Sequence, residues 1–146
     1  MARLDAARVA AWRELQSVTA ALERTVDEAL VAEWDVPLGS FDVLAGLQRL
    51  GGSARPSDLA AELRLVRSSL SRRLDRLEEE GWVARRRPAT PEDHRAVIVE
   101  LTRRGRALWR EMNVTYRRAV QANVASVLDD TDVGELRRIL GLLSAG

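Results

Sequence analysis

Residues 59–101 read LAAELRLVRSSLSRRLDRLEEEGWVARRRPATPEDHRAVIVEL, and their pattern determines the architecture expected for the whole chain. They contain two short amphipathic segments, a glycine stop at Gly81 and two strand-like runs around a proline-containing turn. In the second amphipathic segment Leu70, Leu74 and Leu77 recur at i, i+4 and i+7, so they share one face of a helix. The opposite face gathers hydroxyl and guanidinium side chains: Ser68, Ser69, Ser71, Arg72, Arg73 and Arg76.

A helix face of this composition suits a groove of double-stranded nucleic acid. Arginine forks onto guanine edges or phosphates, and serine donates to or accepts from either. The alternative is a merely solvated face, and Glu78, Glu79 and Glu80 show that the end of this helix is not a phosphate contact. The order of elements favours the first interpretation. A short helix, a turn, a polar-faced helix and a basic hairpin form a winged helix-turn-helix, whose second helix enters the major groove.

Composition and charge narrow the class of protein. The chain has 146 residues, enough for one domain, and 46% hydrophobic with 31% charged residues is typical of a soluble folded chain. Only 4% are aromatic, so we expect a core of Leu, Val and Ala built mainly from helices. Residues 1–54 have five arginines against eight acids, residues 55–110 fourteen against nine, and residues 111–146 four against five. A basic middle between two mildly acidic ends localises an anionic partner to the middle.

Several kinds of chemistry are not expected. The chain has no cysteine, which excludes disulfides and thiolate nucleophiles, and one histidine is too few for a zinc site. A catalytic role for His94 would need Asp93 and a serine oriented around it, which adjacent turn residues rarely achieve. The apolar runs are too short to span a membrane, and the charged N-terminus lacks a signal-peptide core. We therefore expect a cytoplasmic protein that is not an enzyme, has no cofactor or metal, and has no membrane partner.

Helices are expected before the hairpin. The spacing of apolar residues predicts helices over residues 4–33, 40–50, 57–63 and 66–80. Ser40 is a candidate N-cap of the second helix, and Gly51-Gly52 stops it. Pro56 suits the first turn of the third helix, and Gly81 suits the C′ position of the fourth, the recognition helix.

The hairpin is expected to present positive charge to the partner. Residues 82–87 and 96–101 have the pattern of strands, and residues 88–94 that of the turn between them. Arginine dominates this hairpin, at Arg85, Arg86, Arg87 and Arg95. Charge along a strand edge also keeps the edge soluble, so solubility is the alternative interpretation.

The two ends of the chain are expected to form helices that pair with a second copy. Thr102 is predicted to cap a helix that reaches about Leu128, and Thr131 or Asp132 to cap a last helix over residues 133–143. The helix at residues 4–33 is too long to bury its apolar stripe against a small domain alone. Pairing of the end helices would give a twofold dimer.

From about Pro37 to Met112 the chain resembles the MarR family of bacterial transcriptional regulators. The most specific piece is the wing motif, Asp93-His94-Arg95, followed by alternating apolar residues that lead into a Thr-capped helix. The other matching pieces lie in order along the chain: Ser40-Phe41-Asp42-Val43-Leu44, Leu59-Ala60, Ser68-Ser69, Leu74-Asp75-Arg76-Leu77-Glu78, Gly81-Trp82-Val83, then Val97, Val99, Leu101-Thr102 and Gly105. The end helices match in pattern rather than in motif.

The resemblance implies a mainly α fold with a small β-hairpin wing, in which a winged helix-turn-helix domain is flanked by N- and C-terminal dimerisation helices. It implies one domain over residues 1–146, with dimerisation helices in 1–36 and 103–146 and a DNA-binding lobe in 37–102. The implied function is a homodimeric, sequence-specific DNA-binding regulator, expected to be a repressor, of a pseudo-palindromic operator. Arg95 would enter the minor groove, since a narrow A·T groove concentrates negative potential. Asp93 would hold that arginine, or a neighbouring one, in place. The side chains implied to face the major groove are Ser68, Ser69, Arg72 and Arg73.

The resemblance also implies a ligand. Many family members release DNA when a small, often aromatic and anionic, compound binds between the dimer helices and the DNA-binding lobe. Trp12, Arg13 and Phe41 are candidate neighbours of such a ligand, because the family's pocket lies near the first two helices. For Trp12 and Phe41 the alternative is an ordinary place in the core.

Three residues near the recognition helix depart from the family pattern. Arg64 stands where glycine is usual in the preceding turn, Val66 where a polar N-cap is common, and Arg55 where threonine is frequent. A left-handed backbone at Arg64 and a missing cap at Val66 would each cost about 1 kcal/mol. Arg64, Val66 and the glutamates at positions 78–80 leave a second hypothesis open, a winged-helix adaptor that binds proteins and not DNA.

Overall fold

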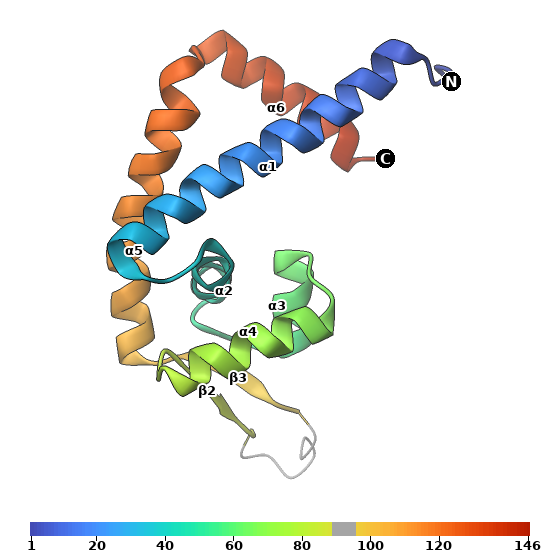
Figure 1. Cartoon of the computed structure of the whole chain (residues 1–146). Coiled ribbons are helices and arrows are strands. Elements are labelled where there is room, and N and C mark those ends of the chain that lie inside the picture. The colour runs from blue at the N-terminus through green and yellow to red at the C-terminus, as the bar shows by residue number, and fades with distance from the viewer. Residues whose placement is uncertain (89–95) are drawn as a thin grey trace.

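The computed structural model describes residues 1–88 and 96–146, and it consists of an elongated upper part and a compact lobe (Figure 1). The upper part contains α1 (Ala6–Trp34), α5 (Arg103–Asn123), a short 3-10 helix (Ala125–Val127) and α6 (Asp130–Ser144). The lobe contains α2 (Leu38–Arg49), α3 (Pro56–Leu63), α4 (Arg67–Glu79) and three short strands. The prediction of a mainly helical chain with a small hairpin is confirmed.

The three strands β1 (Ser53–Ala54), β2 (Val83–Arg86) and β3 (Ile98–Leu101) form an antiparallel sheet in the order β1-β3-β2. β2 and β3 make the expected hairpin, in which Val83 lies opposite Leu101. The sequence does not predict β1. A run of two residues carries no alternation pattern, and its pairing with Val99 and Glu100 joins segments far apart in the chain.

The start of α2 differs from the expectation. The helix begins at Leu38, and Ser40 lies buried inside it rather than at its N-cap, so that prediction is wrong. The backbone N–H of Leu38 donates to Asp27 Oδ1 of α1 at 2.8 Å. The carboxylate of Asp27, on another helix, therefore accepts a backbone N–H at the start of α2 that was expected to find a local partner.

The C-terminal helices also have other limits than expected. α5 ends at Asn123, short of Leu128, and the chain continues as a 3-10 helix. α6 is capped by Asp129, whose carboxylate accepts the backbone N–H of Asp132 at 2.8 Å. The Asp132 side chain in turn accepts the backbone N–H of Asp129 at 3.0 Å, which completes a capping box. A cap at Thr131 or Asp132 is therefore wrong, because the helix starts earlier.

The core of the lobe is one apolar cluster to which its helices and strands all contribute. Leu70, Leu74 and Leu77, the stripe predicted on the recognition helix, are 0–1% exposed. Their partners in the cluster are Val43, Leu44 and Leu47 of α2, Leu59 and Ala60 of α3, and Val83, Val99 and Leu101 of the hairpin. Burial of each large side chain contributes about 1.5–3 kcal/mol, so the cluster holds α4 with its polar face outward.

A second apolar cluster joins the lobe to the upper part. Leu30 of α1, Phe41 of α2 and Met112 of α5 are almost fully buried in it. A polar contact reinforces the same junction, because Trp34 Nε1 at the end of α1 donates to Thr115 Oγ1 of α5 at 2.9 Å. The C-terminal end of α1 is thus anchored to both α2 and α5.

Close backbone contact fixes the start of α5 on the lobe. A methyl group at Gly105 would lie 1.9 Å from the Trp82 carbonyl oxygen, so no larger residue fits there. Thr102 caps α5, as predicted, by accepting the Gly105 N–H at 3.0 Å, and its hydroxyl donates to the Gly81 carbonyl at 2.6 Å. Gly81 ends α4 with φ +78°, a conformation that glycine adopts without strain. The end of α4 and the start of α5 therefore form one rigid joint.

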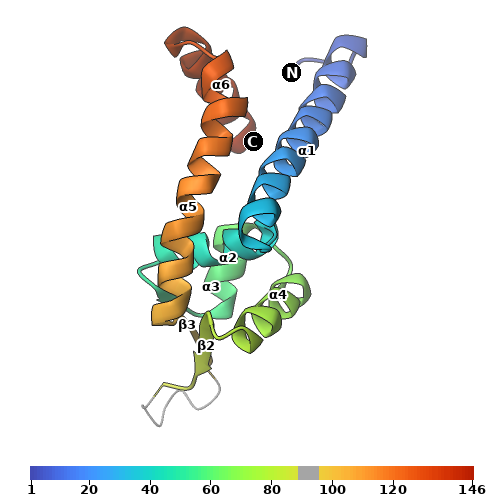
Figure 2. The same cartoon turned by 60° about the vertical axis from the view of Figure 1, so that its left-hand side comes forward.

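α6 and the N-terminal half of α1 extend beyond the lobe (Figure 2) and expose apolar side chains. Trp12 of α1 is 59% exposed and Leu143 of α6 is 61% exposed, and every residue of α6 is exposed. Among the described residues, no element covers these apolar side chains of α1 and α6. In the same residues, no helix combines the length and the apolar character needed to cross a membrane.

Gly105→Ala is expected to destabilise the protein, although alanine is the better helix former. The added methyl group would collide with backbone that cannot move aside, and overpacking of this kind costs about 1–3 kcal/mol or more. Urea unfolding measures the loss. Gly134→Ala in α6 is the matched control, because nothing lies within 4 Å of its added methyl group and about 1 kcal/mol of helix propensity is gained. A Gly105→Ala unfolding midpoint at or above that of the unmodified chain would contradict the rigid joint.

Candidate nucleic-acid interface

α3 and α4 form a helix-turn-helix beside the β2–β3 hairpin (Figure 1). Arg64 at the end of α3 has φ 54°, so the turn does require the left-handed backbone that glycine would supply without strain. Val66 occupies the N-cap position of α4 and makes no side-chain capping bond. Both departures from the usual turn chemistry are therefore real features of the structure.

The outer face of α4 is polar. Ser68, Ser71, Arg72 and Arg76 are exposed, and Ser69 is half-buried. Within the described part of the chain Arg72 and Arg76 form no ion pair, so both guanidinium groups can meet an anionic partner. Ser68 and Arg72 lie opposite the leucine stripe, Ser69 and Ser71 flank them, and Arg76 borders a hollow beside Trp34 and Trp82. The contact of these five side chains with DNA stays a prediction.

Arg73 points away from this face. Its Nη1 donates to the Gly39 carbonyl of α2 at 3.2 Å, and its Cζ lies 3.1 Å from where a side chain at Gly39 would begin. The expectation that Arg73 faces outward beside Arg72 is therefore corrected. Successive helix residues diverge by about 100°, which turns Arg73 towards α2. This arginine joins the recognition helix to the start of α2.

Arg85 lies along the surface of α4, with its side chain 25% exposed. Its Nη1 lies 2.7 Å from Asp75 Oδ1 and 3.4 Å from Glu78 Oε1, and its Nη2 donates to the Ser71 carbonyl at 3.3 Å. Its backbone N–H donates to the other carboxylate oxygen of Glu78 at 3.2 Å. One guanidinium group thus clamps β2 to α4. Arg85 was expected to face DNA, but it is engaged by the acidic residues of α4, and these contacts connect the hairpin to the helix.

The remaining predicted DNA contacts lie on the hairpin. Arg86 is exposed and pairs with Glu100 on the neighbouring strand at 3.0 Å. Arg87 follows β2 and is exposed as well. The wing motif, Asp93-His94-Arg95, lies outside the described residues 1–88 and 96–146. The roles expected of that motif therefore stay predictions.

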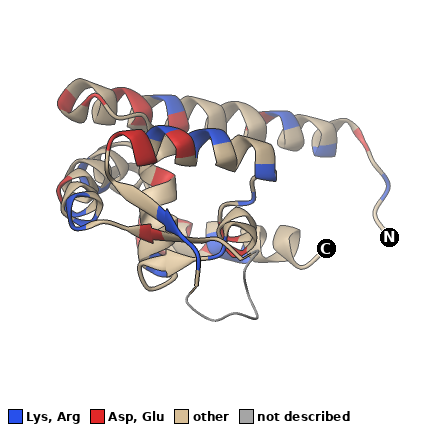
Figure 3. Cartoon of the chain, turned by 90° about the horizontal axis from the view of Figure 1, so that it is seen from below, with Lys and Arg blue, Asp and Glu red and all other residues tan. Residues whose placement is uncertain are grey.

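Four further arginines at the starts of α4 and α5 are exposed, although the sequence pattern did not single them out: Arg67, Arg103, Arg104 and Arg106. Arg67 begins α4, and the other three stand in the first turn of α5 next to the sheet. The signal that could have found the three arginines of α5 is their run directly after the Thr102 cap. Figure 3 views the chain from below and shows basic and acidic segments side by side.

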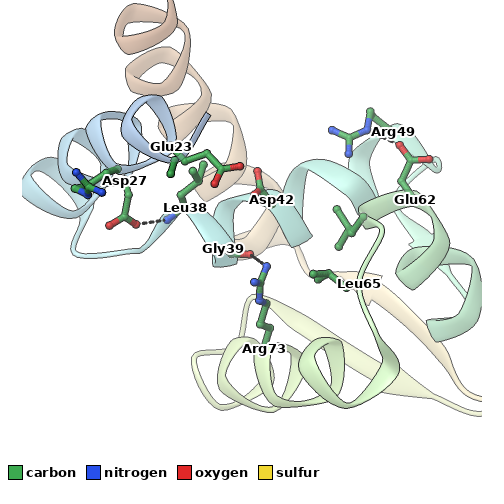
Figure 4. Close-up of a pocket in the computed structure, with 12 residues that line it drawn as sticks. Glu23, Asp27, Leu38, Gly39, Asp42, Arg49, Glu62, Leu65 and Arg73 are labelled. Atoms are coloured by element: carbon green, nitrogen blue, oxygen red, sulfur yellow. Dashed lines mark hydrogen bonds and ion pairs between the residues drawn. The ribbon is translucent and has the colours of Figure 1, made fainter. Parts of the chain in front are cut away.

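A cleft of about 630 Å³ lies between α1 and the lobe (Figure 4). Its charged lining comes from four helices: Glu23, Arg24 and Asp27 of α1, Asp42 and Arg49 of α2, Glu62 of α3 and Arg73 of α4. Two of the basic groups have partners inside the chain, since Arg49 pairs with Glu62 at 2.7 Å and Arg73 donates to the Gly39 carbonyl. Through Arg73, the cleft is connected to the helix that carries the outer polar face.

Asp42 holds its proton more tightly than an ordinary aspartate. Burial in the cleft is the main cause and raises the pKa of its carboxyl above the usual 3.8. The positive charge of Arg73 opposes the rise. Glu23 adds to it, and Arg49 opposes it to a smaller extent. Proton uptake at Asp42 would therefore change the charge of the cleft near the recognition helix.

The three residues expected around a ligand do not come together within one chain. Phe41 is 2% exposed and stacks on Tyr116 with 4.7 Å between ring centroids, so it belongs to the core. Trp12 and Arg13 lie exposed on the part of α1 that extends beyond the lobe. Trp12 borders a separate hollow of about 680 Å³ with Arg64 and the apolar side of α6. Within one chain Phe41 and Trp12 therefore do not border the same site, which corrects their expected grouping. A ligand role of Trp12 and Arg13 stays a prediction.

Known regulators share this arrangement of elements. The model of the MarR family matches residues 34–96, from the end of α1 into the hairpin. The HTH-type transcriptional regulator PecS of Dickeya dadantii (strain 3937) is 31% identical over 129 residues, which cover 87% of this chain and 75% of that protein. The sequence similarity therefore extends from the lobe into the flanking helices.

Solved structures of regulators bound to DNA share the whole fold. Sco3205, a MarR family transcriptional regulator from Streptomyces coelicolor in complex with DNA, is 26% identical, with a TM-score of 0.87 over 99% of this chain and 89% of that chain. A mutant MarR from E. coli, complexed with operator DNA, is also 26% identical, with a TM-score of 0.82 over 97% of this chain and 99% of that chain. By its fold, its helix-turn-helix and these relatives, the chain belongs to the MarR family of transcriptional regulators.

Proposed function

We propose that this regulator binds a pseudo-palindromic operator as a homodimer in the cytoplasm, represses transcription, and leaves the DNA when a small molecule occupies the cleft. The polar outer face of α4, with Arg72 and Arg76 exposed, is the observation that carries the proposal. The relatives Sco3205 and MarR from E. coli were solved with DNA, which supports the same role for the same architecture. An adaptor without DNA binding is less well supported, because Glu78, one of the acids that suggested it, is engaged by Arg85.

Contact with DNA is proposed at two places in each lobe. The outer residues of α4 would enter the major groove, since a recognition helix lies in that groove. The hairpin would follow the neighbouring minor groove or backbone with Arg86 and Arg87. The clamp at Arg85 supports this division, because it makes helix and hairpin approach the duplex as one body. Arg73 and Arg85 would then position these elements, and Arg67 and Arg103 would add phosphate contacts.

Dimerisation is proposed through α1 and α6. Leu136, Ile139 and Leu140 of α6 are each about 40% exposed although they form one apolar stripe. A contiguous apolar patch on a soluble chain marks an interaction surface. A second copy offers the same surface, and twofold symmetry would present two recognition helices about one duplex turn apart.

Ligand release is proposed at the cleft between α1 and the lobe. An aromatic or anionic compound bound there could attract the Arg73 guanidinium, which now donates to the Gly39 carbonyl. Loss of that bond would change how α4 sits against α2. The chemistry of the lining therefore supports a small polar effector, with Arg73 as its link to the recognition helix.

DNA affinity is expected to fall steeply with salt, by about 10³–10⁵ between roughly 50 and 200 mM if about six to ten phosphates are contacted. A fluorescence anisotropy titration of a selected duplex measures this. Arg72→Ala should weaken binding tenfold or more, because each dimer loses two charged contacts. Arg117→Ala, an exposed arginine of α5 remote from α4, is the control and should bind like the unmodified chain. A flat salt curve would rule out the electrostatic part of the proposal.

Ile139→Glu is expected to convert the dimer to monomers, because it places a charge in the apolar stripe of α6. Sedimentation velocity at micromolar concentration gives the molecular mass directly. Ile139→Val keeps the stripe apolar and should leave the mass unchanged. If the unmodified chain sediments as a monomer, the homodimer is wrong.

Asp42→Asn is expected to raise the free energy of unfolding at pH 7. The pKa of Asp42 is higher in the folded chain than in the unfolded chain, so the folded chain binds more protons. The free energy of unfolding therefore falls as the pH rises from about 3.8 through the raised pKa. Asparagine removes this loss, so its advantage should shrink as the pH is lowered toward 3.8. Urea unfolding across that range measures the difference. Asp58→Asn, an exposed aspartate of α3, should show no such gain, and an equal gain there would contradict the assignment to burial.

A further inference from the structure

Val66 stands at the N-cap of α4 with φ −72° and ψ 148°, yet it makes no capping hydrogen bond. Ser, Thr, Asp or Asn in this position accepts a backbone N–H of the first helical turn, which valine cannot do. The same turn contains Arg64 at φ 54°, where a residue other than glycine is strained. Two residues unsuited to the local backbone therefore meet at the start of the helix.

The Val66 side chain does not compensate for the lost cap by packing. It is 67% exposed, whereas the preceding Leu65 is partly buried and lines the cleft. Side chains alternate in direction along an extended backbone, which sends Val66 outward. Branching at Cβ restricts rotation about χ1, so its two methyl groups have few positions available. The backbone is held as well, because Leu65 N–H donates to the Ala60 carbonyl at 3.0 Å and Leu70 N–H to the Val66 carbonyl at 3.2 Å.

The surroundings of Val66 belong to the proposed DNA contact. Arg67 and Ser68 follow it on α4, and both are exposed. The first residues of a recognition helix meet base edges in the major groove. On those edges the thymine C5 methyl group offers an apolar contact, while the other groups are hydrogen-bond donors and acceptors. An exposed pair of methyl groups with restricted rotation at this place matches that one feature of the groove.

We propose that Val66 contacts the C5 methyl group of a thymine in each half of the operator, and that this contact makes the regulator prefer thymine at one fixed position. The inference rests on the proposed DNA-binding function. Valine at the cap replaces a hydrogen bond within the helix by an apolar contact with a base. It therefore reads a group that the neighbouring arginines and serines cannot detect by hydrogen bonding.

Deoxyuridine tests the contact, because it lacks the methyl group of thymine and keeps every hydrogen-bonding group. The probe is a duplex that the purified chain selects from a random DNA library, resynthesised with each thymine in turn replaced by deoxyuridine. For the unmodified chain, one symmetric pair of replacements should weaken binding about fourfold per half-site and roughly fifteenfold together, the effect of burying one methyl group. The Val66→Ser variant should bind the selected duplex and its deoxyuridine-substituted form with equal affinity. Its unfolding midpoint in urea should rise, because serine restores the cap.

Val114→Ser changes an exposed valine of α5 and is the matched control, which should keep the loss on deoxyuridine. If the unmodified chain selects no DNA, the proposed function fails and the Val66 contact fails with it. If the chain selects DNA but tolerates every deoxyuridine, or Val66→Ser still discriminates, the Val66 contact is overturned and DNA binding stands. A lower unfolding midpoint or a changed oligomeric mass for Val66→Ser would assign the side chain to packing and also overturn it.

Discussion

The contact between Gly105 and the Trp82 carbonyl sets the direction in which α5 leaves the lobe. α1 packs along α5, and α6 continues from it, so this one backbone contact orients the whole upper part relative to α4. The Thr102 side chain, bonded to both sides of the contact, excludes rotation about it. The spacing of two recognition helices in a symmetric pair would depend on the same joint. A regulator that must match a fixed distance on DNA needs such a rigid connection.

Features that depend on neighbours within one helical turn could be predicted from the sequence. The leucine stripe of α4, the stop at Gly81 and the Thr102 cap all belong to this kind. Features that depend on distant segments could not be predicted. Asp27 of α1 supplies the acceptor at the start of α2, and β1 exists only because β3 lies beside it. The limits of α5 and the cap of α6 were missed because competing polar residues crowd that boundary.

The sequence predicted which residues belong to the candidate site but not the directions in which their side chains point. The charge pattern located arginines on α4 and the hairpin, yet it gave no means to separate those facing out from those facing in. The separation follows from acidic and carbonyl partners: Asp75 and Glu78 draw Arg85 onto α4, and the Gly39 carbonyl draws Arg73 under it. Arg72 and Arg76 meet no such partner in the described residues and stay on the outside. Identical side chains thus divide between building the lobe and presenting charge.

Arg73 extends from the helix whose opposite side is exposed and reaches the wall of the cleft. A duplex on one side of α4 and a small molecule on the other would act on the same turns of one helix. Thermodynamic linkage then makes the influence mutual. If a bound effector lowers the affinity for DNA by some factor, bound DNA lowers the affinity for the effector by the same factor. Promoters with tightly bound copies would respond only at higher effector concentrations than weaker ones, so a single regulator of this construction could release its targets in sequence.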